Sequence, residues 1–453
     1  MTHPQHRSTW SSRWAFMLAT AGSAIGLGNI WKLPYMIGVN GGSAFVLVFL
    51  ACIFLVGIPL MMCETMLGRR AQRNPVDGMQ ALAQEAGTSK AWRWVGISGL
   101  FAGLLILGFY SIIAGWVLDY IVRAAGGEFT GIDGAGATAK FETFLGQPLR
   151  LLLWHSLFIA MTLGVVSRGV NAGLEKANNI LIPALFAILL VLVGYSMAVG
   201  DFARSVAFMF TPDFSRITPV AILSALGHAF FSLSLGMGAV MVYGSYLQRH
   251  VSITRATMII AVADTSVGLL VGLAIFALVF ANHLEPAAGP GLIFQTLPIA
   301  FGSMPWGDVI GTLFFLLVAF AAWTSAISLV EPAVAWLTEN TRLTRKQSAL
   351  LIGVGDWLLG IAVLLSFNAW QDVRLVFGLG IFDTLDKLTS TIMLPLGGLA
   401  MALFAGYFMK TRQVQEELGL GPSGYGFWRF LVRYVAPVAI VAVFLYLLGI
   451  IQG

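Results

Sequence analysis

A glycine-rich stretch interrupts the first apolar run of the chain. The run extends from about Trp14 to Met36, and its middle reads Ala21-Gly-Ser-Ala-Ile-Gly-Leu-Gly-Asn29. Glycines so closely spaced weaken a helix because they leave the backbone conformationally free. A broken helix is tolerated at membrane depth only where its freed carbonyl and amide groups line a cavity or are buried in protein. The stretch therefore predicts a polar pocket midway across a membrane.

The rest of the chain is equally apolar. Of its 453 residues, 58% are hydrophobic and 10% are charged, which differs strongly from the composition of a soluble domain. Windows of about 20 apolar residues indicate membrane-spanning helices. We predict eleven spans, at about 14–37, 43–68, 92–124, 150–167, 174–198, 219–247, 254–281, 305–337, 346–366, 378–408 and 426–450.

Basic residues gather in alternate loops, beginning with Arg69, Arg70 and Arg73 after the second span. By the positive-inside rule, this pattern predicts a plasma-membrane protein with a cytoplasmic N-terminus and, because the span number is odd, an external C-terminus. The net charge of +5 is thus explained by topology, and no nucleic acid partner is expected. The N-terminal residues lack the features of a cleaved signal peptide.

A second interruption lies in the sixth span, where Phe230-Phe-Ser-Leu-Ser-Leu-Gly-Met-Gly238 combines two serines with two glycines. Because five is odd, a repeated five-span unit must start from the opposite membrane face, and two such units led by broken helices describe an inverted-repeat transporter. We therefore expect an all-α integral membrane protein with broken helices one and six. Its expected parts are a cytoplasmic segment (1–13), a first five-helix repeat (14–198), an external loop (199–218), a second, inverted five-helix repeat (219–410), and a cytoplasmic loop with an extra eleventh helix (411–453).

In these features the chain resembles the neurotransmitter:sodium symporter family, whose members have the leucine-transporter fold. The resemblance covers spans one to ten. It implies a sodium-coupled amino-acid symporter working by alternating access, with no enzyme activity and no nucleotide. The family's twelfth span is missing. We therefore expect a monomer embedded in lipid, without a dimer interface built on that span. The residues that carry the resemblance are Gly22-Ser-Ala-Ile-Gly-Leu-Gly-Asn-Ile-Trp-Lys-Leu-Pro34, Asn40-Gly-Gly-Ser-Ala-Phe45, Gly57-Ile-Pro-Leu60, Glu64, Gly68-Arg69, Phe231-Ser-Leu-Ser-Leu-Gly236 and Thr324-Ser325.

The resemblance implies two sodium sites. The first would combine the substrate's own carboxylate with Ala24 (through its carbonyl), Asn29, Ser232 and Asp264. The second would use the carbonyls of Gly22, Ile25 and Ala321 and the hydroxyls of Thr324 and Ser325. Asp264 is especially informative, because an ionisable group in the middle of a span is costly and usually functional. Animal members of the family have a neutral amide there and recruit chloride, so this carboxylate predicts that chloride is not required.

The implied substrate is an amino acid bound through its carboxylate. Family members that carry amines without a carboxylate have an aspartate in the first break, whereas the matching residue here is Gly26. The amides of Leu27 and Gly28 and the hydroxyl of Tyr110 match carboxylate-binding positions, and Ala24 and Ser232 are expected to contact the substrate too. The mostly apolar set around the substrate side chain favours hydrophobic L-amino acids. That set is Ile106, Phe231, Ser234, Met237 and Leu329.

The resemblance also implies gates. Lys32 and Asp386 match an outer charged pair that usually contains arginine, and lysine cannot form the same two-point bond to a carboxylate. Phe231 and Tyr110 would form an aromatic lid over the substrate.

Arg7 and Glu339 match the family's inner charged pair, with Trp10 packing beside it and Tyr246 supporting it. Gly173 and Pro183 stand at the start of span five, where a weakened turn could unwind and admit water to the second sodium site. A static kink is an equally good interpretation of these two residues.

Two other functions stay open. Protons could drive transport through Asp264 and His228, whose matching position lies beside the family's chloride site. Alternatively, the protein could be a sensor that binds an amino acid without moving it. Glu64 is expected simply to accept hydrogen bonds from backbone amides that the breaks expose.

Overall fold

The first span is broken where its glycines predict a break. In the computed structural model, which describes residues 9–286 and 291–447, helix α1 (Arg13–Ala24) ends at mid-span. Ile25 then takes an extended conformation, with a ψ angle of 94°. The chain becomes helical again in a wide, π-helical turn from Gly28 to Lys32, which leads into α2 (Leu33–Val39).

The sixth span is interrupted in the same way. Helix α11 (Pro219–Ser232) and helix α12 (Ala239–Ser245) are separated by six residues without regular helix. Within this gap, Ser234, Gly236 and Gly238 have φ angles of 54°, 81° and 78°. A Cβ atom on Gly236 would collide with the carbonyl oxygen of Leu394, so the sharp turn depends on glycine at that position.

Among the described residues, nine further helical stretches are long and apolar enough to cross a membrane. Their ranges overlap predicted spans, and no strand accompanies them in the described ranges. The nine, with the helices they contain, are Ser43–Ala71 (α3 and α4), Lys90–Ala125 (α6), Pro148–Val166 (α8), Val170–Val199 (α9), Ile253–Ala281 (α13), Gly307–Asn340 (α15), Arg345–Leu365 (α16), Ile381–Phe408 (α17 and α18) and Pro422–Tyr446 (α20 and α21).

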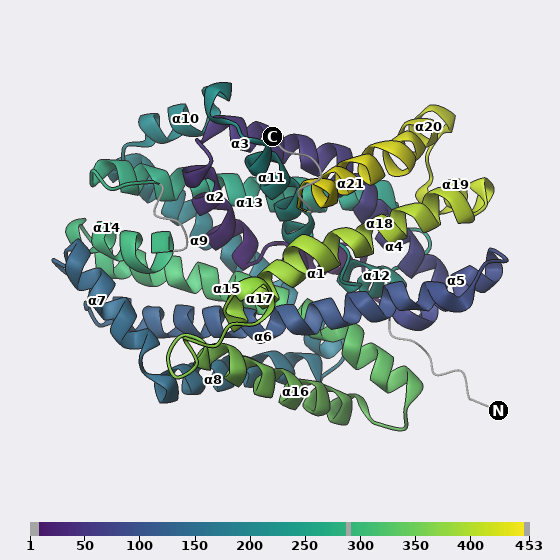
Figure 1. Cartoon of the computed structure of the whole chain (residues 1–453), viewed down its shortest axis with the longest axis horizontal. Helices are drawn as coiled ribbons and strands as arrows, with labels where there is room; N and C mark the ends of the chain where they lie inside the picture. Colours follow the sequence, from purple (N-terminus) through teal and green to yellow (C-terminus); the bar gives the residue numbers. More distant parts are fainter. Residues whose placement is uncertain (1–8, 287–290, 448–453) are drawn as a thin grey trace.

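Short helices that the sequence analysis did not predict form much of the loops. Figure 1 shows α7 and α14 at one end of the molecule, and α5 and α19 at the opposite end. The short helices are α5 (Pro75–Glu85), α7 (Gly134–Leu145), α10 (Phe202–Phe210), α14 (Leu297–Ser303) and α19 (Thr411–Leu418).

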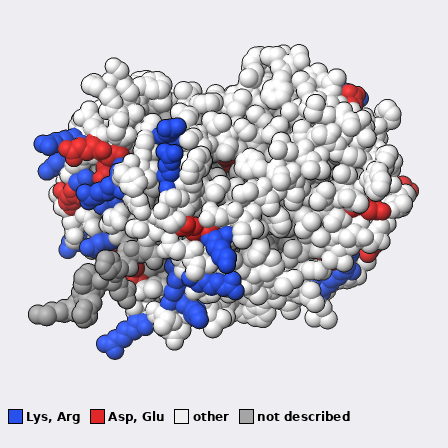
Figure 2. Space-filling view, turned by 180° about the vertical axis from the view of Figure 1, so that it is seen from behind, with Lys and Arg blue, Asp and Glu red and all other residues white. Residues whose placement is uncertain are grey.

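The surface has the charge distribution of a membrane protein. Figure 2 shows charged side chains over the left half of the molecule and fewer at its right edge, with a broad, largely uncharged region between them. An uncharged band of this kind is suited to the hydrocarbon core of a bilayer.

The broken helices lie inside the bundle. Helix α1 packs against α9, α13 and α15, and α11 packs against α3 and α18. Both breaks are therefore enclosed by protein, as freed backbone groups at membrane depth require.

Candidate functional site

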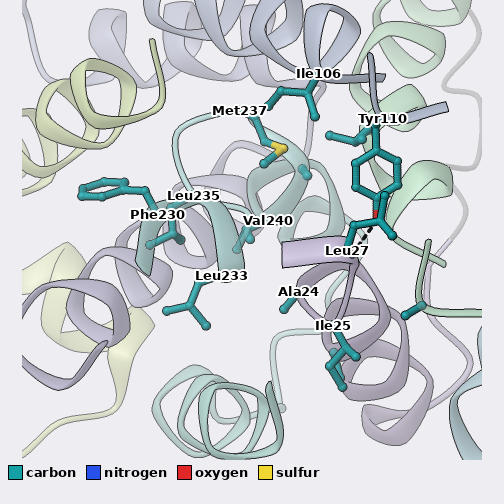
Figure 3. Packing of buried hydrophobic residues seen from close by; sticks show 14 of the residues in the cluster. Ala24, Ile25, Leu27, Ile106, Tyr110, Phe230, Leu233, Leu235, Met237 and Val240 are labelled. Carbon is teal, nitrogen blue, oxygen red and sulfur yellow. Dashed lines mark hydrogen bonds between the residues drawn. The ribbon is translucent and has the colours of Figure 1, made fainter. Parts of the chain in front are cut away.

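The two breaks exchange hydrogen bonds with other spans. In an uninterrupted helix, the amide of Leu27 would donate to the carbonyl of Ser23. Here the Leu27 amide donates to the hydroxyl of Tyr110 over 3.0 Å, and the Ser23 carbonyl accepts from the hydroxyl of Ser234 over 2.8 Å. Side chains from spans three and six thus replace the missing helical bond. Figure 3 shows the contact between Leu27 and Tyr110.

A third connection links Glu64 to the second break. The amide of Gly236 donates to Glu64 Oε1 over 2.5 Å, and the glutamate is fully buried. This is the role that the sequence analysis expected for Glu64.

The oxygen atoms predicted for the first sodium site converge. Asn29 Nδ2 donates to Asp264 Oδ1 over 2.8 Å, and the Ser232 hydroxyl donates to Asp264 Oδ2 over 2.7 Å. Ser232 Oγ also lies 3.3 Å from Asn29 Oδ1. All three side chains are buried. Asp264 forms no ion pair within the described ranges, so a buried carboxylate lies here among neutral groups.

His228 does not join this cluster. Both of its ring nitrogens lack a hydrogen-bond partner among the described residues. Proton coupling through Asp264 and His228 would use a contact between them, but no hydrogen bond joins the two among the described residues, where the Asp264 carboxylate accepts from Asn29 and Ser232. The imidazole instead packs against the ring of Phe49, with centroids 5.4 Å apart.

The residues predicted for the second sodium site lie where α1 meets α15. Thr324 donates its hydroxyl to the carbonyls of Phe320 and Ala321, both at 3.1 Å. A Cβ atom on Gly22 would lie 3.1 Å from Thr324 Cβ, and one on Gly26 would lie 2.9 Å from Ser325 Oγ. Helix α1 ends at Ala24, so the carbonyls of Gly22 and Ile25 flank the point where its hydrogen bonding stops.

A cavity beside the first break gathers most of the predicted substrate contacts. Figure 3 shows two of them, Ile106 and Met237, near each other and on the same side of Ala24. Leu27 and Ser232 do not line the cavity: Leu27 faces a second cavity, and Ser232 faces Asp264. The lining consists of Ala24, Gly26, Gly28, Ile106, Tyr110, Phe231, Ser234, Met237, Ser325 and Leu329.

Two aromatic residues separate this cavity from the second one. Tyr110 and Phe231 line both spaces, and Lys32 and Asp386 line only the second. Lys32 Nζ lies 2.9 Å from Asp386 Oδ1 and 5.0 Å from the centre of the Phe231 ring. The predicted lid (Phe231 and Tyr110) therefore lies between the first cavity and the predicted outer pair (Lys32 and Asp386).

At the opposite end, Arg7 lies outside the described residues, so its predicted pairing with Glu339 is not described. Glu339 Oε2 accepts from the amide and the side chain of Asn74, at 3.0 and 2.7 Å. Trp10 is buried, and its backbone amide and indole donate to the carbonyls of Tyr246 and Tyr243 at 3.1 and 3.0 Å.

A buried ion pair that was not predicted from the sequence lies next to Tyr246. Glu331, fully buried in span eight, pairs with Arg345, which donates from Nη1 to Oε1 over 3.1 Å and also contacts Oε2. The Tyr246 hydroxyl donates to the same carboxylate over 2.8 Å. An ionisable residue inside an apolar span is itself a functional signal, and Glu331 could have been identified in this way from the sequence.

The start of span five is wound in this structure. A π-helical segment, Val170–Glu175, continues directly into α9 (Lys176–Val199), which contains Pro183. Glu175 accepts from the amide of Ser11 over 3.2 Å and also contacts its hydroxyl. The N-terminal segment is thus fastened to the turn that contains Gly173.

Comparisons with known proteins agree with this arrangement. The model of the sodium:neurotransmitter symporter family matches residues 7–130 and 143–452. An uncharacterised sodium-dependent transporter of Bacillus subtilis, YhdH, is 39% identical over 447 residues, which cover 98% of each chain. The dopamine transporter of Bos taurus is 23% identical and is matched over 68% of its length, by 96% of this chain.

A solved structure is also similar. The crystal structure of MhsT in complex with L-phenylalanine superposes with a TM-score of 0.90 at 42% identity, covering 97% of this chain and 99% of MhsT. Fold and site together define a multi-pass membrane transporter. The chain belongs to the sodium:neurotransmitter symporter family.

Proposed function

We propose that this protein uses the sodium gradient to import hydrophobic L-amino acids. The observation that carries the proposal is the buried carboxylate of Asp264, whose hydrogen-bond partners among the described residues are the neutral side chains of Asn29 and Ser232. An ionised carboxylate is costly to bury without a counter-charge, and a bound cation would supply that charge. Oxygen donors suit a hard cation, and the family is sodium-dependent.

Coupling would arise from a contact shared by ion and substrate. The first site offers Asp264, Asn29, Ser232 and the carbonyl of Ala24, and the substrate carboxylate would complete it. Gly26 leaves room for that carboxylate, since a Cβ atom there would lie 2.8 Å from the Tyr110 hydroxyl. Sodium and amino acid would therefore each strengthen the binding of the other.

The substrate side chain would enter an apolar space. Ile106, Met237 and Leu329 line the cavity, and the hydroxyl of Ser234 already donates to the carbonyl of Ser23. A polar substrate side chain would find few free donors, so an apolar one is favoured. The complex of MhsT with L-phenylalanine supports this substrate class for a protein 42% identical to this chain.

We propose alternating access as the mechanism. Sodium and the amino acid would bind from the outside past the Lys32–Asp386 pair, and Phe231 and Tyr110 would then close over them. Release to the cytoplasm would require the contacts of Trp10, Glu331 and Arg345 to separate. The moving units would derive from residues 14–198 and 219–410, with the N-terminus in the cytoplasm and the C-terminus outside.

The ion requirements follow from the two sites. One sodium would bind at Asp264, and a second would bind among neutral oxygens from Gly22, Ile25, Ala321, Thr324 and Ser325. The covalently attached charge of Asp264 would make chloride unnecessary.

The test is uptake of radiolabelled L-phenylalanine into proteoliposomes, in competition with each natural amino acid. We expect uptake to require sodium, to persist when gluconate replaces chloride, and to be inhibited best by apolar amino acids. Uptake that continues in potassium or choline would instead indicate proton coupling. Sodium-dependent binding without uptake would indicate a sensor.

A further inference from the structure

Asn178 presents an unpartnered oxygen inside the bundle. It lies in span five, on α9, and is completely buried. Its side-chain nitrogen donates to the carbonyl of Leu174 over 2.8 Å, which orients the amide group. Its side-chain oxygen, Oδ1, has no hydrogen-bond partner among the described residues. A buried hydrogen-bond acceptor without a donor is unfavourable. A bound ligand that contacts this oxygen would remove that cost.

The oxygen points at the residues predicted to hold the second sodium ion. A Cβ atom added to Gly22 would collide with Asn178 Oδ1, and that same Cβ atom would lie 3.1 Å from Thr324 Cβ. Glycine at position 22 therefore allows the amide oxygen to approach the backbone of α1. Spans one, five and eight meet at this point, and α1 packs against both α9 and α15.

We propose that Asn178 is a further oxygen donor of the second sodium site, acting on the ion directly or through one water molecule. The inference rests on the proposed sodium coupling and adds a residue from a third span to a site otherwise formed by spans one and eight. An amide oxygen is a suitable ligand for a hard cation. It adds no charge, so the ion remains weakly held and able to leave.

This contact would connect the ion to the start of span five. The Asn178 side chain is bonded to the carbonyl of Leu174, and the next residue, Glu175, holds Ser11 of the N-terminal segment. An ion that orders the Asn178 amide would therefore stabilise the first turns of α9. Loss of the ion would release Asn178 and weaken the turn between Gly173 and Pro183.

The test compares Asn178→Ala with Asn179→Ala, which removes the same side chain at the exposed neighbouring position. Binding of radiolabelled L-phenylalanine is measured while sodium replaces potassium at constant ionic strength. For Asn178→Ala we expect a half-saturating sodium concentration roughly three to ten times that of the wild type. At saturating sodium, its affinity for L-phenylalanine should be that of the wild type. Asn179→Ala should match the wild type throughout.

A second variant tests the sign of the effect. Asn178→Asp preserves size and one oxygen and adds a negative charge, so it should lower the half-saturating sodium concentration at pH 8. An unchanged sodium dependence in Asn178→Ala, or an unchanged or weaker sodium affinity in Asn178→Asp, would overturn the assignment. Wild-type binding that needs no sodium would instead overturn the proposed function itself.

Discussion

The side chain of Asn29 donates to the carboxylate of Asp264 over 2.8 Å, although the two residues are 235 positions apart in the chain. The same Asn29 nitrogen also donates to the backbone carbonyl of Asp264 over 2.9 Å. This double contact fixes the amide so that its oxygen faces Ser232. Asn29, from the first break, and Asp264, from span seven, are thereby held in position by each other. Their side-chain oxygens form a preorganised set of ligands for an ion.

Asp264→Ala should abolish sodium-dependent binding of L-phenylalanine at neutral pH. The variant removes the negative charge that would offset the ion, and we expect the affinity for sodium to fall by more than about thirtyfold. Equilibrium binding across a sodium titration measures the effect. Asp372→Ala removes an exposed loop carboxylate and should leave the sodium dependence of binding unchanged. Sodium dependence retained in Asp264→Ala would remove this residue from the site.

Substitution of Gly26 should act on the substrate rather than on folding. A Cβ atom would lie 2.8 Å from the Tyr110 hydroxyl and 2.9 Å from Ser325 Oγ, so Gly26→Ala should weaken amino-acid binding. Gly26→Asp should exclude amino acids, because its carboxylate would occupy the place of theirs. Gly164→Ala adds a methyl group where no atom lies within 4 Å and serves as the control. Undiminished uptake by Gly26→Asp would contradict the proposed substrate orientation.

Loss of the outer pair should speed release of the bound amino acid. Lys32 and Asp386 are partly exposed, and pairs of this kind contribute about 0.2–1 kcal/mol. We expect Lys32→Met to raise the dissociation rate by up to about fivefold. Lys32→Arg should lower it, because guanidinium can bind a carboxylate at two points.

Dissociation of radiolabelled L-phenylalanine after dilution measures this rate. The exposed pair of Arg412 and Glu416 supplies the control, and Arg412→Met should behave as the wild type does. Equal dissociation rates in Lys32→Met and the wild type would mean that the pair does not restrain the substrate.

Arg345→Ala should destabilise the end of the protein that we propose faces the cytoplasm. Among the described residues, the substitution leaves the buried Glu331 with the Tyr246 hydroxyl and without its cation, and breaking a buried pair typically costs about 3–5 kcal/mol. The fraction of L-phenylalanine binding that survives heating in detergent measures the loss. Arg342→Ala, at an exposed position three residues earlier, should retain wild-type resistance. Equal resistance in both variants would show that the pair contributes little.

The elements that could be predicted are those with a strong local signal. Glycine at 22, 26 and 28 weakens a helix whatever surrounds it, so the first break followed from composition alone. Asp264 stood out because a charge inside an apolar run is rare. Long apolar windows likewise located the uninterrupted spans, although helices such as α7 and α19 are too short or too polar for those windows to detect.

What could not be predicted depends on the rotation of each helix about its axis. Asn178 and Asn179 are identical neighbours in sequence, yet one is buried and the other exposed. The hydroxyl of Ser234 was expected to face the substrate side chain, and it also bonds the Ser23 carbonyl because position 234 has a positive φ angle. A contact between His228 and Asp264 was one possibility from the sequence, but among the described residues both His228 ring nitrogens lack a hydrogen-bond partner.

The bond between Ser234 and the Ser23 carbonyl has a consequence for biosynthesis. The acceptor emerges from the ribosome 211 residues before its donor, an interval of roughly 10 to 40 seconds at ordinary rates of translation. During that time the Ser23 carbonyl, at the break in the first span, lacks the Ser234 hydroxyl that later donates to it. The early chain must therefore rely on water, lipid headgroups or the insertion machinery until the second half has been made.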